Sequence, residues 1–452
     1  MRWQLSALVK SSTWVSTQGL RLVSREHVLS LVDQVVVSGT AFLTTLLVAR
    51  WSGPSQLGVY AVGISLLGFL LTCQDSLIIE PYLIQRHYPQ GTTAERAGAS
   101  LTLSILFSTG SLLALTIVAF GFQQRDAGSE MFVMTWAIAG VVPFALTRDF
   151  ARRFSFAQLR FGGALLLDAA VALMQLSTLG WLGASGRMSA LSAWGALGGA
   201  CAFAAAGWLY STRGQFAIRV RHVRTGLTET WALGKWLLAG QITVQVQGNI
   251  TYWLLIAGVG AAVTGVFAAC MSIVAFANPL LQGLGNTLLP KMVLAWNNGG
   301  GPALRREAIR NTVLIAALVA SFSLAVLFVG EHVMQLLYHG TVFEGHGHTL
   351  TVLALAMSAG AVGVPASFAL ATMERPIAIV TATTLGASLT IGLVWLFMTK
   401  WGLLGAAYGL LGGSVGGTVG RWAAFFFLVP QTFESARQLE QKTHEFERIP
   451  AA

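Results

Sequence analysis

Charged residues are scarce in this sequence: Asp, Glu, Lys and Arg make up 10% of its 452 residues, whereas 54% are hydrophobic. A soluble domain carries about 25% charged residues, so this composition indicates that lipid is the solvent. The net charge of +10 could suggest nucleic acid, but that function needs basic residues gathered on a folded soluble face. Here they lie in short gaps between long apolar runs, so we expect membrane lipids and no nucleic acid as partners.

Cysteine is scarce too. Cys73, Cys201 and Cys270 each fall inside an apolar run, so a disulfide scaffold is not expected.

The stretch up to His27 lacks the apolar core and cleavage site of a signal peptide, so we expect no processing. No GxxxxGKS or GxxxxGKT run occurs, which excludes ATP hydrolysis by such a loop, and no cofactor is expected.

Long apolar runs fill most of the chain. A bilayer core of about 30 Å needs roughly 20 mostly apolar residues in an α-helix, because no water is present to satisfy bare backbone groups. We therefore predict an all-α polytopic membrane protein with about twelve spans. They are expected at about 28–49, 57–79, 97–120, 131–147, 162–183, 189–210, 233–257, 260–282, 309–330, 349–371, 377–398 and 402–428.

The distribution of basic residues supports that number. With both termini in the cytoplasm, 24 of the 28 Lys and Arg fall on the inner side, and four, Arg50, Arg125, Arg187 and Lys400, fall outside. Loops with excess Lys and Arg stay cytoplasmic. An error of one span in the middle would scramble this alternation, so the sequence predicts cytoplasmic termini.

Two short phrases occur twice in the chain. The segment GVYAVGIS at 58–65 is similar to GVFAACMS at 265–272, and the segment AWGALGG at 193–199 is similar to AYGLLGG at 407–413. Gly- and Ala-rich membrane helices look alike by composition, but two matches in the same order on corresponding spans favour a duplication. Because six spans precede the second copy, we expect parallel repeats related by a pseudo-two-fold axis along the membrane normal.

The repeat divides the chain into two lobes. The predicted segments are a cytoplasmic N-terminal segment at 1–27, an N-lobe at 28–211, a cytoplasmic linker at 212–232, a C-lobe at 233–428 and a cytoplasmic tail at 429–452.

This organisation resembles a known family. Two six-helix halves, the first loop ARWSGPSQLGVYAV and the basic segment ARRFSFAQLRFG resemble the polysaccharide flippase (Wzx-type) branch of the multidrug/oligosaccharidyl-lipid/polysaccharide (MOP) exporter superfamily. The resemblance covers roughly 25–430 and implies a MATE-like fold. It also implies transport of undecaprenyl-pyrophosphate-linked oligosaccharides through a cavity between the lobes. The drug-exporting branch shares the fold, so fold alone does not choose between the branches.

Three acids fall within predicted spans: Asp33, Asp75 and Asp168. An ionisable residue in a span usually faces the bundle interior or a watery cavity. We interpret these acids as candidates for H⁺ or Na⁺ coupling. The alternative is an interfacial acid that is wetted by headgroups or neighbours a Lys or Arg.

Uncharged polar residues form two stripes in the second half. Shifted by the repeat, Asp33 corresponds to Gln241 and Asp75 to Gln282. Residues spaced four apart lie on one helical face, so the stripes predict a polar wall for sugar hydroxyls, although they could instead bond neighbouring helices. The candidate cavity residues are Gln241, Gln245, Asn249, Asn278, Gln282 and Asn286.

A pyrophosphate would need cations at the cytoplasmic mouth, because guanidinium groups bind phosphate in a bidentate fashion. The candidates are Arg148, Arg152, Arg153, Lys235 and Lys291, although the topology rule alone would also place basic residues there.

Arg421, late in the last span, is expected to snorkel to the cytoplasmic surface. The loop HGTVFEGHGH at 339–348 lacks any metal-ligand spacing, so no metal is expected.

The sequence therefore predicts a transporter of the bacterial inner membrane rather than an enzyme. It would flip lipid-linked oligosaccharides for exopolysaccharide or O-antigen biosynthesis, alongside a polysaccharide polymerase and glycosyltransferases as partners. A cation-coupled multidrug exporter is the alternative. A membrane-embedded polymerase or ligase is less favoured, because such enzymes need a sizeable outer loop and the largest one here spans about eighteen residues.

Overall fold

The computed structural model describes residues 17–85, 92–126, 130–217, 220–338 and 341–429. Within these ranges the chain is helical apart from short turns and contains no strand. The helices are α2 (Thr17–Gln74), η1 (Asp75–Ile79), α3 (Glu80–Gln85), α4 (Thr93–Asp126), α5 (Glu130–Ala157), α6 (Phe161–Ala184), α7 (Ala190–Thr212), η2 (Arg213–Gln215), α8 (Val220–Gly258), α9 (Ala261–Val274), η3 (Ala275–Ala277), α10 (Asn278–Tyr338), α11 (Gly347–Val362), α12 (Val364–Thr372) and α13 (Pro376–Leu428).

Three of these helices each contain two rods. The backbone leaves the helical region at Gly53 in α2, at Gly300 in α10 and at Gly402 in α13. Conversely, α9, η3 and the start of α10 form one continuous rod, as do α11 and α12. Counted as rods, the described residues contain twelve, and seven of the helices, three of them the kinked ones, are long and apolar enough to cross a membrane. This confirms the all-α polytopic fold.

The predicted linker at 212–232 is only partly a linker. Helix α8 begins at Val220 and continues into the seventh pass, so a polar helical extension precedes the apolar span. Helix α2 likewise begins at Thr17, before the first predicted span. Hydropathy detects the apolar part of a helix and not its ends in water.

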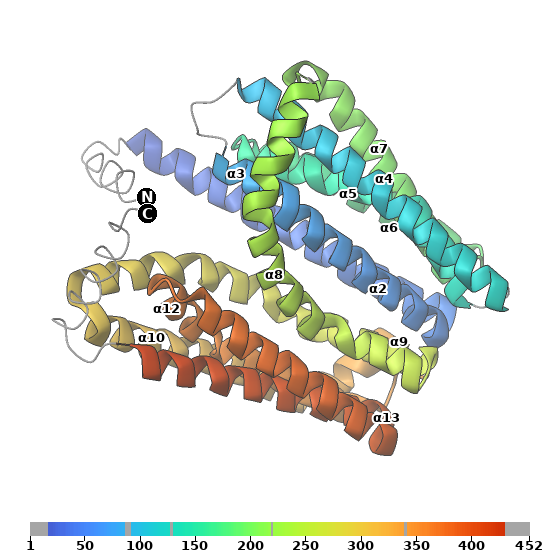
Figure 1. Cartoon of the computed structure of the whole chain (residues 1–452). Helices are drawn as coiled ribbons and strands as arrows, with labels where there is room; N and C mark the ends of the chain where they lie inside the picture. The colour runs from blue at the N-terminus through green and yellow to red at the C-terminus, as the bar shows by residue number, and fades with distance from the viewer. Residues whose placement is uncertain (1–16, 86–91, 127–129, 218–219, 339–340, 430–452) are drawn as a thin grey trace.

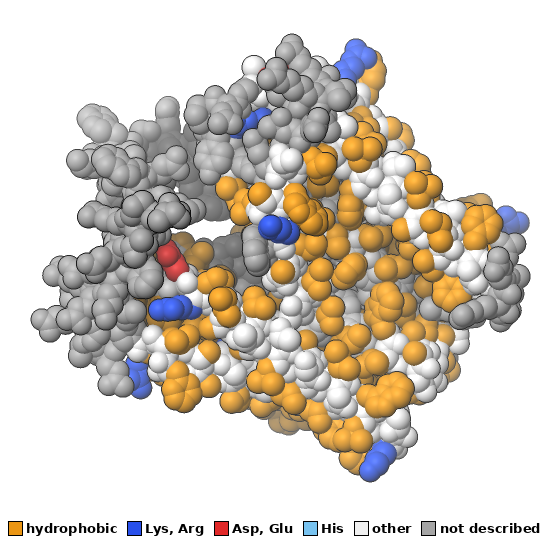
Figure 2. All heavy atoms as spheres, viewed as in Figure 1, with side chains coloured by type: hydrophobic (Ala, Val, Ile, Leu, Met, Phe, Trp, Pro, Cys, Tyr) orange, Lys and Arg blue, Asp and Glu red, His pale blue; other side chains and the backbone are white. Residues whose placement is uncertain are grey.

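Figure 1 shows two groups of helices, α2 to α7 on one side and α10 to α13 on the other, with α8 running from the first group to the second. The groups meet where α2 lies against α9 and diverge toward the end at which α2 begins. Most of the side chains on the face shown in Figure 2 are hydrophobic, with Lys and Arg confined to a few places.

The two lobes repeat the same backbone turns. Gly53 and Gly260, which are 207 positions apart, both have positive φ (79° and 115°) and extended ψ (176° and 170°). Leu159 and Glu374, 215 apart, both have positive φ (59° and 56°), and each precedes an arginine that begins a helix. Positive φ is uncommon outside glycine, so this agreement identifies corresponding turns.

The duplicated phrases meet each other in space. A Cβ atom at Gly58 would lie 1.9 Å from the carbonyl oxygen of Ala261, and a Cβ atom at Gly265 would lie 1.9 Å from that of Pro54. Pro54 and Ala261 are also related by 207 positions. Each lobe therefore makes the same contact on the other, which is the signature of a two-fold axis. We call this contact the glycine crossing.

The glycine crossing leads to the first prediction. Replacing Gly58 by Ala places a methyl group on a backbone oxygen, so the rods must separate, at a cost of about 1–3 kcal/mol. We expect a lower Tm in detergent. The matched control is Gly110→Ala in α4, where a Cβ atom meets nothing within 4 Å and helix propensity favours Ala by up to ~1 kcal/mol. Equal Tm values for the two variants would contradict the assignment.

Candidate functional site

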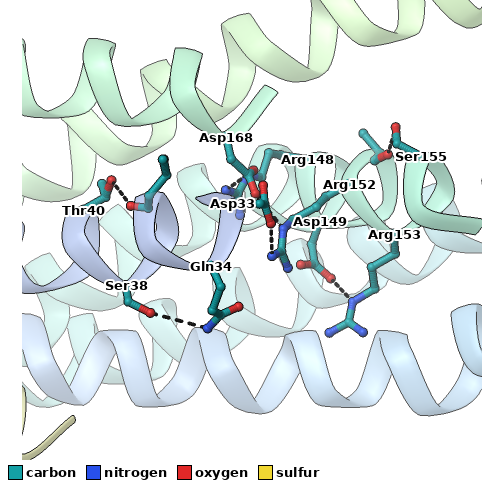
Figure 3. A network of polar contacts seen from close by, with 12 residues as sticks. Asp33, Gln34, Ser38, Thr40, Arg148, Asp149, Arg152, Arg153, Ser155 and Asp168 are labelled. Carbon is teal, nitrogen blue, oxygen red and sulfur yellow. Dashed lines mark hydrogen bonds and ion pairs between the residues drawn. The ribbon is translucent and has the colours of Figure 1, made fainter. Parts of the chain in front are cut away.

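A buried ion-pair network joins α2, α5 and α6. Arg152 contacts two carboxylates at once: its Nη2 lies 2.7 Å from Asp33 Oδ2 and its Nε lies 2.6 Å from Asp168 Oδ2. Asp168 also pairs with Arg148, one helical turn before Arg152 (Figure 3). Both carboxylates are 1% exposed. The i, i+4 spacing of the two arginines puts them on one face of α5, so one acid on α6 can bridge both.

A second branch of the network reaches the other rod of α2. Arg153 pairs with Asp75, and its Nε lies 3.0 Å from Asp149 Oδ2. Asp75 is the first residue of η1, a single π-helical turn inside this pass. Such π-turns occur frequently at functional sites, because the extra residue changes the direction of the side chains around it.

The network carries unequal charge. Within the described residues it contains four carboxylates (Asp33, Asp75, Asp149 and Asp168) and three guanidinium groups (Arg148, Arg152 and Arg153). Oδ1 of Asp33 and Oδ1 of Asp75 are buried without a hydrogen-bond partner. One proton or one monovalent cation would complete the charge balance, and a buried oxygen without a partner is costly.

The sequence assigned these residues to two separate roles, three acids for coupling and three arginines for pyrophosphate. The structure brings all six together, with the arginines engaged by the acids. Each of the three acids neighbours an arginine, which the sequence analysis gave as one alternative. Coupling by these acids stays a prediction. Asp149, which sequence reasoning missed, belongs to the same network, and its spacing of four from Arg153 was the available signal.

A polar cavity of about 410 Å³ lies between the lobes. The two rods of α2 form one wall, and α8, α9, η3 and the first residue of α10 form the other. Trp253 of α8 donates to Ser65 Oγ of α2 (2.8 Å) and links the two lobes beside it. The polar residues of the lining are Gln34, Ser38, Thr45, Ser65, Asn249, Ser272 and Asn278, and the aromatic ones are Phe42, Tyr60, Tyr252 and Phe276.

The glycine crossing closes one end of this cavity. Leu57 and Ala268 of the lining lie within three residues of Gly58 and Gly265. The lining then follows α2 in the direction of Gln34, one residue from Asp33. The cavity and the ion-pair network are therefore neighbours on α2.

The predicted polar stripes lie in part along this cavity. Asn249 and Asn278 line it. The amide nitrogen Nε2 of Gln245 lies 3.0 Å from where a Cβ atom of Gly68 would be, so this side chain faces α2 across the interface. Gln241 is exposed. The side chains of Gln282 and Asn286 lie outside the described residues.

Sequence reasoning missed the polar residues of the facing wall. Gln34 and Ser38 are spaced i, i+4 on α2, and Gln34 Nε2 donates to Ser38 Oγ (3.4 Å). The same spacing that revealed the stripe on α8 was therefore present here.

Of the predicted basic residues at the mouth, Lys235 and Lys291 are both exposed. Among the described residues, no three His, Cys, Asp or Glu side chains are grouped as metal ligands would be.

Comparison with known proteins identifies the fold. No protein-family model and no curated protein matches the sequence. Among solved structures, an inward-facing multidrug resistance MATE family transporter of the MOP superfamily superposes with a TM-score of 0.64 at 14% identity, covering 89% of this chain and 93% of that chain. The chain has a MATE-like fold.

Two further MATE-like structures agree. A MOP superfamily transporter from Pyrococcus furiosus Vc1, described by a binding pocket of reverse polarity, has a TM-score of 0.63 at 13% identity, covering 90% of this chain and 94% of that chain. An outward-facing multidrug resistance MATE family transporter has a TM-score of 0.62 at 14% identity over the same shares. The MATE-like fold makes the chain an integral membrane protein. At 13–14% identity, these similarities establish the fold of the chain. They do not show that the chain belongs to the polysaccharide branch.

The network predicts which acid stabilises the fold. Asp168→Asn removes the one charge that both Arg148 and Arg152 contact, and breaking such a buried pair costs about 3–5 kcal/mol. We expect a large fall in Tm in detergent. The control is Glu307→Gln, because Glu307 pairs with Arg310, whose side chain is 62% exposed, and such surface pairs contribute about 0–1 kcal/mol. A Tm for Asp168→Asn within a degree of the control would contradict this role.

Proposed function

We propose that this protein is a secondary transporter that flips an undecaprenyl-pyrophosphate-linked oligosaccharide from the cytoplasmic to the periplasmic leaflet by alternating access. It would lie in the bacterial inner membrane with both termini in the cytoplasm. Glycosyltransferases that build the substrate, and a polymerase that consumes it in exopolysaccharide or O-antigen biosynthesis, are the partners that follow from this role.

The observation that carries the proposal is the chemistry of the cavity between the lobes. Its polar groups are amides and hydroxyls, together with the phenols of Tyr60 and Tyr252, and no carboxylate belongs to its described lining. Such groups both donate and accept hydrogen bonds, as sugar hydroxyls require. Asp33 lies beside the cavity but pairs with Arg152. A cavity for cationic drugs would be expected to present an acid instead.

The arrangement of the lobes supports alternating access. The glycine crossing closes one end of the cavity, and the lobes diverge toward the other end (Figure 1). In transporters built from repeats, substrate sites lie at the interface between them, and one repeat rocks against the other. By the charge topology, the diverging end faces the cytoplasm. The oligosaccharide would enter there while its isoprenoid tail stays in the bilayer.

Export of drugs by cation coupling is the second candidate. It is supported by the likeness to multidrug resistance MATE transporters and by the four aromatic side chains in the cavity lining. Aromatic faces bind apolar and cationic ligands. They also stack on sugar rings, so the functional assay has to separate the two candidates.

The ion-pair network is the candidate for energy coupling. With one more carboxylate than guanidinium group, it would take up one H⁺ or Na⁺, and Asp33 and Asp75 have the oxygens without partners. Binding or loss of that cation would change the balance of charges that holds α2 against α5 and α6. Exchange of partners within the network would then free Arg148, Arg152 or Arg153 for a pyrophosphate, for which Lys235 and Lys291 are the further candidate cations.

A flipping assay tests the function. Asn249→Leu and Asn278→Leu each remove one amide from the cavity lining, and a lost hydrogen bond to a substrate costs about 0.5–1.5 kcal/mol. Two such losses cost about 1–3 kcal/mol, so we expect the double variant to flip lipid-linked oligosaccharide about 5- to 150-fold more slowly in proteoliposomes. The control is Asn311→Leu, distant from the cavity. Efflux of cationic dyes without flipping of the sugar lipid would favour the drug exporter.

Asp33→Asn tests the coupling. Arg148 and Arg152 both keep a carboxylate partner, Asp168, in this variant, whereas Asp168→Asn leaves Arg148 without one, so the fall in Tm should be smaller for Asp33→Asn. Turnover driven by a pH or Na⁺ gradient should drop at least tenfold, because the variant lacks one of the two carboxylates proposed to take up the cation. Gradient-driven turnover at the wild-type rate would remove Asp33 from the coupling mechanism.

A further inference from the structure

The two lobes share a backbone but not their charges. In the N-lobe, every arginine of the network is paired with a carboxylate. The turns at Leu159 and Glu374 fix the local repeat at 215 positions. At that offset the charged residues of α5 and α6 correspond to uncharged ones: Arg148 to Gly363, Arg152 to Ser367 and Asp168 to Thr383. The C-lobe has thus replaced the large ionic groups by small neutral residues.

One cation occupies this region of the C-lobe. The guanidinium of Arg421, on α13, lies so close to Gly363 that a Cβ atom there would be 2.7 Å from its Nη2. Gly363 is the break between α11 and α12, and it is the counterpart of Arg148. By the pseudo-two-fold axis, Arg421 therefore lies at the depth of the N-lobe network, in the opposite lobe.

Arg421 does not snorkel, contrary to the expectation from sequence. Its Nε donates to the carbonyl oxygen of Gly417 (3.2 Å), and its Nη2 donates to Thr418 Oγ1 (3.1 Å). Both acceptors precede it by about one helical turn, so the side chain points back toward the middle of the membrane. Side chains on a helix lean toward its N-terminus, and Gly363 leaves the space for this orientation.

The partners of Arg421 in the described part of the chain are neutral. Neither of its hydrogen bonds goes to a carboxylate, and no ion pair joins it to one. Three of the five N–H groups of a guanidinium remain for another acceptor after these two bonds. Its neighbours Thr418 and Trp422 already donate to the carbonyl oxygens of Ala359 and Val362 at the helix break, so Arg421 is not needed there.

We propose that Arg421 binds a phosphate group of the transported lipid through its remaining N–H groups, while Thr418 orients the guanidinium and Gly363 leaves the space for it. A partly buried cation without a counter-ion is costly, and a diphosphate supplies both the missing charge and bidentate acceptors. This inference rests on the proposed function, which brings a diphosphate between the lobes. It places one phosphate of the diphosphate in the C-lobe, at an arginine with no carboxylate partner in the described part of the chain, and the coupling ion in the N-lobe.

Binding measurements on the full-length protein in nanodiscs of zwitterionic lipid test this site. The probes are undecaprenyl diphosphate, undecaprenol, which lacks the phosphate, and phosphatidylglycerol, an anionic lipid of the surrounding membrane. We expect wild-type protein to bind the diphosphate at least tenfold more tightly than the alcohol. Arg421→Gln should abolish that difference, and Arg421→Lys should restore part of it because it keeps the charge but not the fork of donors.

Two further variants control for folding and position. Lys400→Gln removes an exposed cation that belongs to none of the candidate sites and should leave the affinity for the diphosphate within twofold. Gly363→Ala keeps Arg421 but displaces its guanidinium, and should weaken binding at least fivefold. If Arg421→Gln does not fold, Gly363→Ala and Arg421→Lys decide the question with the same probes.

The outcomes separate the inference from the proposed function. Equal affinity of wild type and Arg421→Gln for every phosphate lipid, or no binding of any of them by wild type, overturns the site. Binding of phosphatidylglycerol alone, still dependent on Arg421, supports an anion site but removes the undecaprenyl-diphosphate substrate. Dependence on Arg421 for the diphosphate alone supports both.

Discussion

The architecture depends on one close approach between two backbones. At the glycine crossing, each of two symmetry-related helices places a glycine against a carbonyl oxygen of the other, and no side chain fits between them. Membrane helices gain little from hydrophobic association, so they rely on such small-residue contacts. The crossing holds the lobes together at one end and closes the cavity there. Its chemistry is weak, since Cα–H and carbonyl groups contribute little each, which allows the contact to form and separate repeatedly.

Electrostatics differs between the lobes, and this difference organises the site. The N-lobe buries acids and arginines that largely neutralise one another, whereas the corresponding region of the C-lobe has small neutral residues and Arg421, whose hydrogen bonds go to neutral acceptors. The described lining of the cavity is uncharged on both walls, and the ion-pair network lies beside the wall that α2 forms. The charged groups are therefore next to the cavity but outside its lining.

The fold could largely be predicted from the sequence, and the site only in part. The twelve passes follow from apolar length and basic loops, and the duplicated phrases locate the symmetry axis. Asp33 and Asp168 could be found because each is conspicuous in an apolar run, and Arg152 because it lies in a basic segment between two spans. Their pairing was not predictable, since it depends on which faces of three helices distant in sequence meet. Gln34 and Ser38 were missed, although they have the same i, i+4 spacing as the stripe on α8. The side chain of Arg421 was placed wrongly, because snorkelling considers one helix and not the gap left by Gly363 on its neighbour.

The exchange of Arg148 for Gly363 between corresponding positions has a consequence for how the two halves evolved. Duplicated halves that start identical would have carried the same ionic groups twice. With the acids and arginines of the network in one half only, the halves are not interchangeable: a tandem of two second halves would lack the network, and a tandem of two first halves would lack the small neutral residues that correspond to it. The two-fold relation therefore holds for the backbone and not for the side-chain chemistry that it carries.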